Sequence, residues 1–121
     1  MPKILLVDDS KSIRFYLGNL LREAGYQVLE AADGRDGLAC LAHDPVDLVI
    51  TDLSMPNQDG ISMISELKET GAQVPVIGIS GRASNYLALA EHLGASKVFT
   101  KPLDYEQLLA AVKELSQESK P

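Results

Sequence analysis

The chain of 121 residues is long enough for one domain with a hydrophobic core and too short for two. Its hydrophobic share of 45% and charged share of 23% are those of an ordinary globular protein, and the net charge of −6 argues against direct binding of nucleic acid. Cys40 is the only cysteine, which excludes an intrachain disulfide. Because no apolar stretch approaches the roughly 18 residues of a membrane span and no signal-peptide layout is present, we expect a cytoplasmic protein without membrane contact.

Five short hydrophobic runs alternate with stretches of helical periodicity, a pattern that predicts five β-α units. In chain order, the expected elements are the strand Lys3–Val7, the helix Lys11–Ala24, the strand Gln27–Glu30, the helix Gly34–Ala42, the strand Asp47–Thr51, the helix Ile61–Thr70, the strand Val74–Ile79, the helix Ser84–Leu93, the strand Lys97–Thr100 and the helix Tyr105–Ser116. Between the third strand and its helix, the turn-forming residues of Leu53–Gly60 predict a loop. Since right-handed crossovers place helices on both faces of such a sheet, the predicted fold is an α/β, doubly wound parallel sheet.

The domain is expected to occupy residues 1–116, followed by a polar tail, Gln117–Pro121, that is frayed or the stub of a linker. Met1-Pro2 resembles a natural start, so an output domain, if the chain is part of a longer protein, would follow the tail. A free-standing domain that acts by protein contact is the alternative.

Polar residues stand at the ends of separate predicted strands. Asp8 and Asp9 follow the first strand, Asp52 the third, Ser80 the fourth and Lys101 the fifth. Because the carboxyl ends of parallel strands form the ligand-binding edge of an open α/β sheet, we expect these side chains to meet in one pocket.

Three neighbouring carboxylates repel one another unless one takes up a proton or a cation joins them. A hard divalent cation such as Mg²⁺, which prefers oxygen ligands and keeps several waters, fits Asp8, Asp9 and Asp52, and the main-chain carbonyl of Ser54 could complete the protein ligands.

The remaining two polar side chains fit a phosphoryl group. The ammonium of Lys101 and the hydroxyl of Ser80 are not needed to bind a metal, but both can contact the oxygens of a phosphoryl group on Asp52. An aspartate can form such an acyl phosphate by in-line attack. The sequence therefore predicts a metal-and-phosphoryl site with Asp52, Ser80 and Lys101 as its reacting groups.

These residues resemble the receiver domain of two-component response regulators over essentially the whole chain, similar in extent to a single-domain receiver of the chemotaxis-regulator type. The matching segments are Val7–Ser10, Ile50–Pro56, Asp59-Gly60, Ile79–Gly81, Gly94-Ala95 and Lys101-Pro102.

The resemblance implies a flavodoxin-like sheet with strand order 2-1-3-4-5. It implies that Asp52 accepts a phosphoryl group from a histidine kinase or a histidine phosphotransfer protein, with Mg²⁺ bound by Asp8, Asp9, Asp52 and the Ser54 carbonyl, and Asp8 acting through water. Ser80 would be the switch hydroxyl and Lys101 the phosphoryl-binding ammonium, with a cis Lys101-Pro102 peptide. A downstream protein would bind the face formed by the fourth helix, fifth strand and fifth helix.

Two positions depart from the family pattern. Val98 stands three residues before the lysine, where members often carry Tyr or Phe, and Phe99 should face the other side of the strand. Gly81 follows Ser80 where alanine is common, and glycine widens the accessible backbone conformations there. We therefore expect the main change on activation in the backbone of 81–85 rather than in an aromatic ring.

Two other functions are compatible with parts of the pattern. A metal-dependent phosphohydrolase that forms an aspartyl phosphate usually needs a second carboxylate two residues after the nucleophile, where this chain has Ser54, and a cap domain that this chain lacks. A degenerate receiver used only for docking is disfavoured because every polar position of the site is filled. On the first helix we expect Phe15 to face solvent and Tyr16 to be partly buried.

Overall fold

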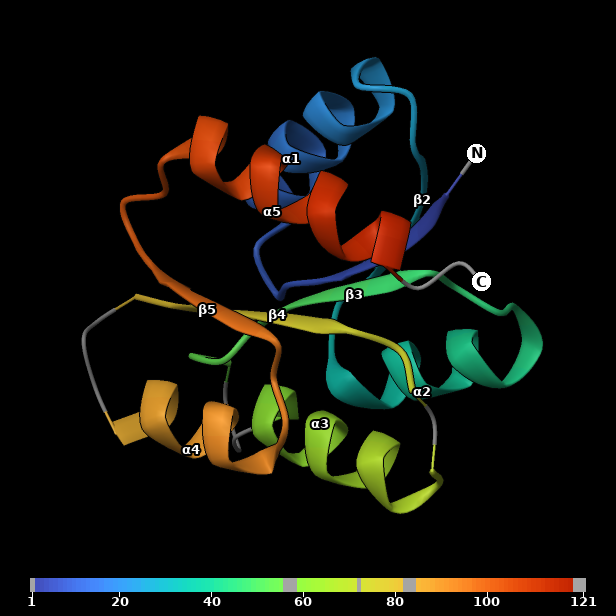
Figure 1. The fold of residues 1–121 in the computed structure, drawn as a ribbon, viewed down its shortest axis with the longest axis vertical. Helices are drawn as coiled ribbons and strands as arrows, with labels where there is room; N and C mark the ends of the chain where they lie inside the picture. Colours follow the sequence, from blue (N-terminus) through green and yellow to red (C-terminus); the bar gives the residue numbers. More distant parts are fainter. Residues whose placement is uncertain (1, 56–58, 72, 82–84, 119–121) are drawn as a thin grey trace.

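A computed structural model describes residues 2–55, 59–71, 73–81 and 85–118 (Figure 1). Strands and helices alternate along the chain in the order β1 Lys3–Val7, α1 Lys11–Glu23, β2 Gln27–Ala31, α2 Gly34–His43, β3 Leu48–Asp52, α3 Asp59–Glu69, β4 Val76–Ser80, α4 Asn85–Leu93, β5 Lys97–Thr100 and α5 Tyr105–Glu118. All ten expected elements are present, and no boundary moves by more than two residues. Among the described residues, no helix is long and apolar enough to cross a membrane.

All five strands are parallel and lie in the order β2-β1-β3-β4-β5, which confirms the expected doubly wound sheet. In the register of β1 and β3, Val7 lies beside Thr51, so the residues after Val7 come to lie near Asp52. On the other side of β3, Asp52 pairs with Ile79, and Ser80 pairs with Thr100 of β5. The polar residues that follow the hydrophobic runs are therefore brought to one edge of the sheet.

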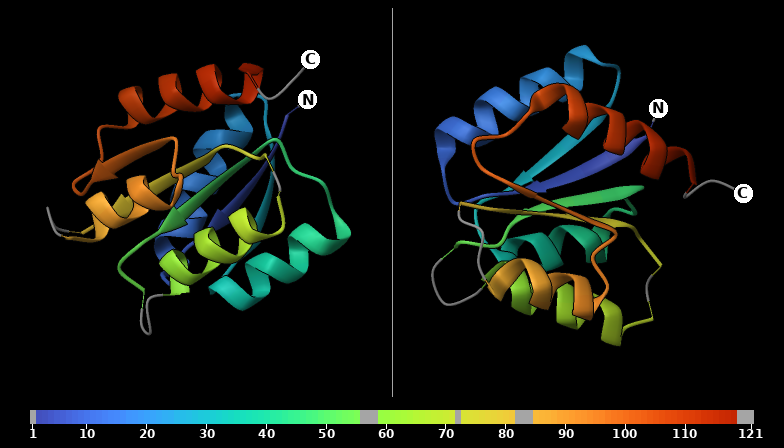
Figure 2. Two further views of the ribbon diagram at one scale, coloured as in Figure 1. Left: turned by 60° about the horizontal axis from the view of Figure 1, so that its bottom comes forward. Right: turned by 60° about the vertical axis from the view of Figure 1, so that its left-hand side comes forward.

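Helices cover both faces of the sheet: α1 and α5 pack on one side, and α2, α3 and α4 on the other (Figures 1 and 2). Successive residues of a strand pack alternately into the two hydrophobic cores, one on each face of the sheet. On β1, Leu5 and Val7 contact the core under α2–α4, whereas Ile4 and Leu6 contact the core under α1 and α5. Because both faces are covered, all residues of the central strands β3 and β4 are buried, as is typical of parallel sheets.

Two expectations about individual elements are corrected. Asp59 and Gly60 lie in the first turn of α3 rather than in a loop; residues 56–58 of that expected loop lie outside the described part of the chain. At the other end, α5 runs through Gln117 to Glu118, so the expected tail begins as helix, and residues 119–121 lie outside the described part.

The exposed face of α1 carries two aromatic residues. The side chain of Phe15 is 69% exposed, as expected, but Tyr16 is 53% exposed rather than partly buried. The ring of Tyr16 stands edge-on to that of Tyr105 at the start of α5, with 5.2 Å between centroids. The buried stripe of α1 instead runs through Leu17 and Leu21, so Tyr16 lies at the rim of the contact between α1 and α5.

Candidate functional site

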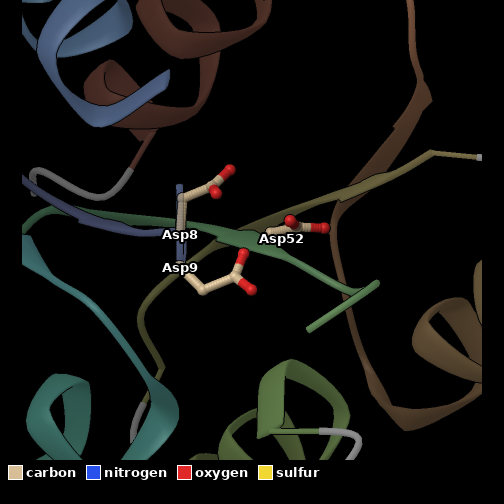
Figure 3. A group of neighbouring side chains, drawn as sticks. All are labelled: Asp8, Asp9 and Asp52. Carbon is tan, nitrogen blue, oxygen red and sulfur yellow. The ribbon is translucent and has the colours of Figure 1, made fainter. Parts of the chain in front are cut away.

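Three carboxylates form the centre of the site. Asp8 and Asp9 follow β1, Asp52 ends β3, and each contributes a carboxylate oxygen to a cluster in which these atoms lie within 4.8 Å of one another (Figure 3). Asp8 and Asp52 are only 2% and 4% exposed, whereas Asp9 is exposed. The strand ends therefore bring together the three acidic side chains as the sequence predicted.

Hydrogen bonds at the end of β1 hold the backbone and the carboxylate of Asp8 beside Asp52. Figure 3 shows Asp8 and Asp9 leaving the backbone toward opposite sides of the sheet, with Asp52 beside them on β3. The amide of Asp8 donates to the Ala31 carbonyl over 3.1 Å and so continues the pairing of β1 with β2. One oxygen of Asp8 accepts the amide of Ser10 over 2.8 Å, and Ser10 caps the start of α1.

The position of Asp8 is electrostatically unfavourable without a cation. Burial raises the pKa of the Asp8 carboxyl from 3.8 to about 6; the hydrogen bond from the Ser10 amide opposes this shift, and the charge of Asp52 adds to it. A divalent cation shared by the three carboxylates would offset the same burial and repulsion. The all-oxygen donor set, buried on one side and open at Asp9, fits Mg²⁺, which keeps part of its water shell.

Asp52 has a different partner on each carboxylate oxygen. Its Oδ1 accepts the main-chain amide of Ser54 over 2.8 Å, and its Oδ2 lies 3.5 Å from the ammonium nitrogen of Lys101. Lys101 extends from the end of β5, and the Lys101-Pro102 peptide is cis, as expected. The amide and the ammonium thus orient the buried Asp52 carboxylate at the carboxyl end of β3.

Ser80 is buried at the carboxyl end of β4, next to Ser54. This last residue of β4 is 1% exposed, and its hydroxyl oxygen lies 3.4 Å from that of Ser54. The Ser54 hydroxyl also accepts the amide of Gly81 over 3.0 Å. The side chain of Ser54 therefore links the segment after β3 to the end of β4, a role that sequence reasoning missed because it considered this residue only as a carbonyl ligand and as a missing carboxylate.

Gly60 is a second residue whose role sequence reasoning missed. A Cβ atom at this position would lie 2.2 Å from the carbonyl oxygen of Asp52 and 3.2 Å from the hydroxyl of Thr51. The first turn of α3 can therefore pack against the end of β3 only because residue 60 has no side chain. The glycine after Asp59 was visible in the sequence, but it was interpreted as a turn signal.

The two departures from the family pattern are placed as expected. Val98 packs against the core under α2–α4 and Phe99 against the core under α1 and α5, so the ring faces away from the side on which Val98 lies. Gly81 follows Ser80 at the end of β4, and the segment 81–85, in which we expect the main change on activation, includes residues 82–84, which lie outside the described residues.

Comparison with known proteins agrees with this geometry. The family model for the response regulator receiver domain matches residues 4–113. The transcriptional regulatory protein CpxR of Klebsiella pneumoniae is 39% identical over 120 residues, which cover 98% of this chain and 51% of CpxR, so the chain spans about half the length of this curated relative.

Solved structures match along the whole domain. The receiver domain of a Francisella response regulator superposes with a TM-score of 0.92 at 29% identity, covering 99% of this chain and 100% of that one. The response regulator TrrA of Thermotoga maritima, solved in complex with Mg²⁺ and BeF, gives a TM-score of 0.86 at 29% identity, covering 95% of this chain and 99% of that one. With its strand order, its acidic cluster at the carboxyl ends of β1 and β3, and these matches, the chain belongs to the family of response regulator receiver domains, phosphorylation-dependent switches of two-component systems.

Proposed function

We propose that Asp52 accepts a phosphoryl group from the phosphohistidine of a histidine kinase or a histidine phosphotransfer protein, and that the phosphorylated chain then binds a downstream protein. The observation that carries this proposal is the environment of the Asp52 carboxylate. Its Oδ2 faces Lys101 at 3.5 Å, and one of its oxygens lies within 4.8 Å of a carboxylate oxygen of Asp8 and of Asp9, where a cation can be shared. Mg²⁺ held by Asp8, Asp9, Asp52 and the carbonyl of Ser54 would neutralise charge on the phosphoryl oxygens.

The transfer needs little chemistry from the protein beyond positioning. A carboxylate oxygen of Asp52 attacks phosphorus, the phosphorus–nitrogen bond of the phosphohistidine breaks, and the imidazole leaves with that electron pair. The amide of Ser54 holds Oδ1 of Asp52, which leaves Oδ2, on the side of Lys101, as the oxygen better placed to attack. Attack of water on the same phosphorus releases inorganic phosphate and restores the carboxylate, so the chain acts as a resettable switch rather than as an enzyme for an external substrate.

Contacts of Ser80 and Lys101 with the phosphoryl group would change the conformation of the neighbouring parts of the fold. Ser80 is the last residue of β4, and Lys101 directly follows the neighbouring strand β5. Both side chains can form charge-assisted hydrogen bonds to phosphoryl oxygens. Movement of the Ser80 hydroxyl toward Asp52 would disturb its contact with Ser54 and hence the bond from Gly81 to Ser54. The backbone of 81–85 would shift, and the face formed by α4, β5 and α5 would change with it.

A phosphohydrolase with an external substrate receives no comparable support. The side chain two residues after Asp52 is the hydroxyl of Ser54, which is engaged by the amide of Gly81 and cannot replace a carboxylate as a general acid.

The test is labelling of the chain by acetyl phosphate with Mg²⁺. We expect one acid-labile phosphoryl group per chain, no labelling of Asp52→Asn, and no labelling of wild type in excess chelator. Asp104→Asn, which changes the N-terminal cap of α5, is a matched control and should label like wild type. Equal labelling of Asp52→Asn and wild type would rule out the assignment, and full labelling in chelator would rule out the role of the metal.

A further inference from the structure

A half-buried arginine on α1 contacts the main chain of the acidic cluster. The side chain of Arg14 is 17% exposed, and its Nη1 donates to the carbonyl oxygen of Asp8 over 2.5 Å. Its Nε lies 3.7 Å from Oε1 of Glu30 on β2. The guanidinium therefore ties α1 and β2 to the peptide that joins Asp8 to Asp9.

Glu30 is itself held in place by a second arginine. Its Oε2 lies 3.0 Å from Nη2 of Arg22, and the same nitrogen donates to the carbonyl of Val28 over 3.3 Å. Gly18 leaves the space for this pair, because a Cβ there would lie 3.3 Å from both Arg22 Nη1 and Glu30 Oε2. The Glu30 carboxylate thus contacts Arg22 through Oε2 and Arg14 through Oε1, and of the two arginines only Arg14 reaches Asp8.

Within the part of the chain that the structure describes, three polar groups of Asp8 have a protein partner. The amide is bound to Ala31, the carbonyl to Arg14 and Oδ1 to the amide of Ser10. These three bonds fix the rotation of the Asp8–Asp9 peptide and with it the direction in which the Asp9 side chain leaves the backbone. Removal of a group that does not bind the metal itself but hydrogen-bonds to a metal ligand commonly lowers metal affinity by about 10–100-fold.

We infer that Arg14 is a positioning residue that sets the affinity of the acidic cluster for Mg²⁺ by holding the Asp8–Asp9 peptide. This inference rests on the proposed magnesium site. It goes beyond that site because it assigns a function to a cation that does not touch the metal.

The direction in which Mg²⁺ affinity changes when Arg14 is replaced distinguishes a positioning role from a purely electrostatic one. A guanidinium near three carboxylates repels a divalent cation, so an electrostatic role alone predicts that removal of Arg14 strengthens Mg²⁺ binding. Positioning predicts the opposite. Arg14→Lys retains the charge but loses the planar fork that contacts Asp8 and Glu30 together, so it should behave like Arg14→Ala if position matters.

The experiment is titration of metal-free protein with Mg²⁺, followed by amide chemical shifts, for wild type and for Arg14→Ala, Arg14→Lys, Arg22→Ala and Asp9→Ala. We expect both Arg14 variants to bind Mg²⁺ about tenfold more weakly, and the amide of Ser10 to shift in both even in chelator. Arg22→Ala, which removes the shorter ion pair to the same Glu30 without touching Asp8, should stay within about twofold of wild type. Thermal unfolding in chelator measures the purely structural loss of each variant.

Affinity equal to or above that of wild type in the Arg14 variants would overturn the inference, as would an equal loss in Arg22→Ala. If Arg14→Ala does not fold, Arg14→Lys decides by the same criteria. Wild-type affinity in Asp9→Ala would instead contradict the magnesium site of the proposed function, so the two failures remain distinguishable.

Discussion

At the scale of single residues, Asp8 is where folding and metal binding oppose each other. Its carboxyl is buried, and its pKa is raised from 3.8 to about 6. Since the folded protein holds this proton more tightly than the unfolded chain does, the stability of the metal-free protein falls as the pH rises from about 4 to about 6, and the full loss is present at neutral pH. In the presence of metal, protonation of Asp8 competes with binding, so Mg²⁺ affinity should fall as the pH drops through this range.

The first prediction follows from that opposition. In chelator at pH 7.5, Asp8→Asn should raise the free energy of unfolding by about 1 kcal/mol, or roughly 4 °C in melting temperature, because it removes a buried charge and keeps an acceptor for the Ser10 amide. At pH 4 the difference should nearly vanish, since wild-type Asp8 is then protonated when folded. Thermal unfolding at both pH values measures it; a gain of the same size at pH 4 would show that the charge is not the cause.

The second prediction concerns Gly60. Gly60→Ala places a Cβ 2.2 Å from the carbonyl of Asp52, so either α3 or the end of β3 must move. We expect a loss of about 1–3 kcal/mol in stability and slower labelling of Asp52 by acetyl phosphate. Gly81→Ala is the control for stability, because among the described residues its Cβ would meet only the Ser54 hydroxyl, at an ordinary 3.7 Å. Wild-type melting temperature and labelling rate in Gly60→Ala would show that the contact is easily relieved.

At the scale of elements, β5 lacks the aromatic ring that many receiver domains move on activation, so the change in this chain is expected at the end of β4 instead. Val98 is small and β-branched, with few rotamers, and Phe99 packs under α1 and α5, so neither offers a ring that can replace Ser80 as it moves. The backbone freedom of Gly81 is then the available source of movement. The bond from its amide to the Ser54 hydroxyl is exposed, so water or another acceptor can replace it.

The third prediction tests this freedom. Gly81→Ala should fold with a melting temperature within a few degrees of wild type, because the methyl group fits and the unfolded chain loses entropy. Its amide shifts for 81–85 on addition of beryllofluoride and Mg²⁺ should be smaller than those of wild type. If the variant responds as fully as wild type, or if Val98 and Phe99 show the dominant shifts in wild type, the backbone of 81–85 is not the main switch.

Most strands were predictable because short apolar runs closed by a polar residue are typical of buried parallel strands, whereas their order in the sheet was implied only by the resemblance to receiver domains. Helix starts were less accurate where tertiary contacts decide them: Asp59-Gly60 is a turn signal locally, yet packing against Asp52 makes it the first turn of α3. Tyr16 lies beside the buried stripe of α1, and only the position of α5 determines that its ring is exposed and edge-on to that of Tyr105.

The candidate site was predictable to the extent that strand ends determine it. Asp8, Asp9, Asp52 and Lys101 meet because parallel strands end at the same edge. The supporting contacts were not predictable: Ser54 meets Gly81 across 27 residues of sequence, and Arg14 meets Asp8 only because α1 crosses above β2. Such contacts depend on how layers dock, which local sequence patterns do not specify.

At the scale of the whole molecule, the proposed output face involves both layers of the fold. α4 packs on one side of the sheet, α5 on the other, and β5 forms the edge strand between them (Figure 2). An ion pair of 3.5 Å between Lys97 and Glu114 joins β5 to α5. A change at the ends of β4 and β5 can therefore reach both helices without disturbing β1 and β2.

The fourth prediction concerns the coupling of the site to this face. Lys101→Ala removes the cation facing Asp52, so the metal-free protein should remain folded but lose some stability at neutral pH as the carboxylates repel. With beryllofluoride and Mg²⁺, we expect amide shifts near Asp52 but weak shifts in α4 and α5. Loss of folding without recovery in Mg²⁺ would show that Lys101 is a structural ion-pair partner instead.

The most direct test of Asp52 as the phosphoryl acceptor of a switch is to compare amide chemical shifts of wild type and Asp52→Asn. Each protein is measured with Mg²⁺ alone and with Mg²⁺ and beryllofluoride. If Asp52 is the phosphoryl acceptor of a switch, beryllofluoride should shift amides around Asp52, Ser80 and Lys101 and along α4, β5 and α5 in wild type, and it should leave Asp52→Asn unchanged. Wild-type shifts confined to the pocket would contradict the switch, and equal shifts in Asp52→Asn would contradict Asp52 as the acceptor.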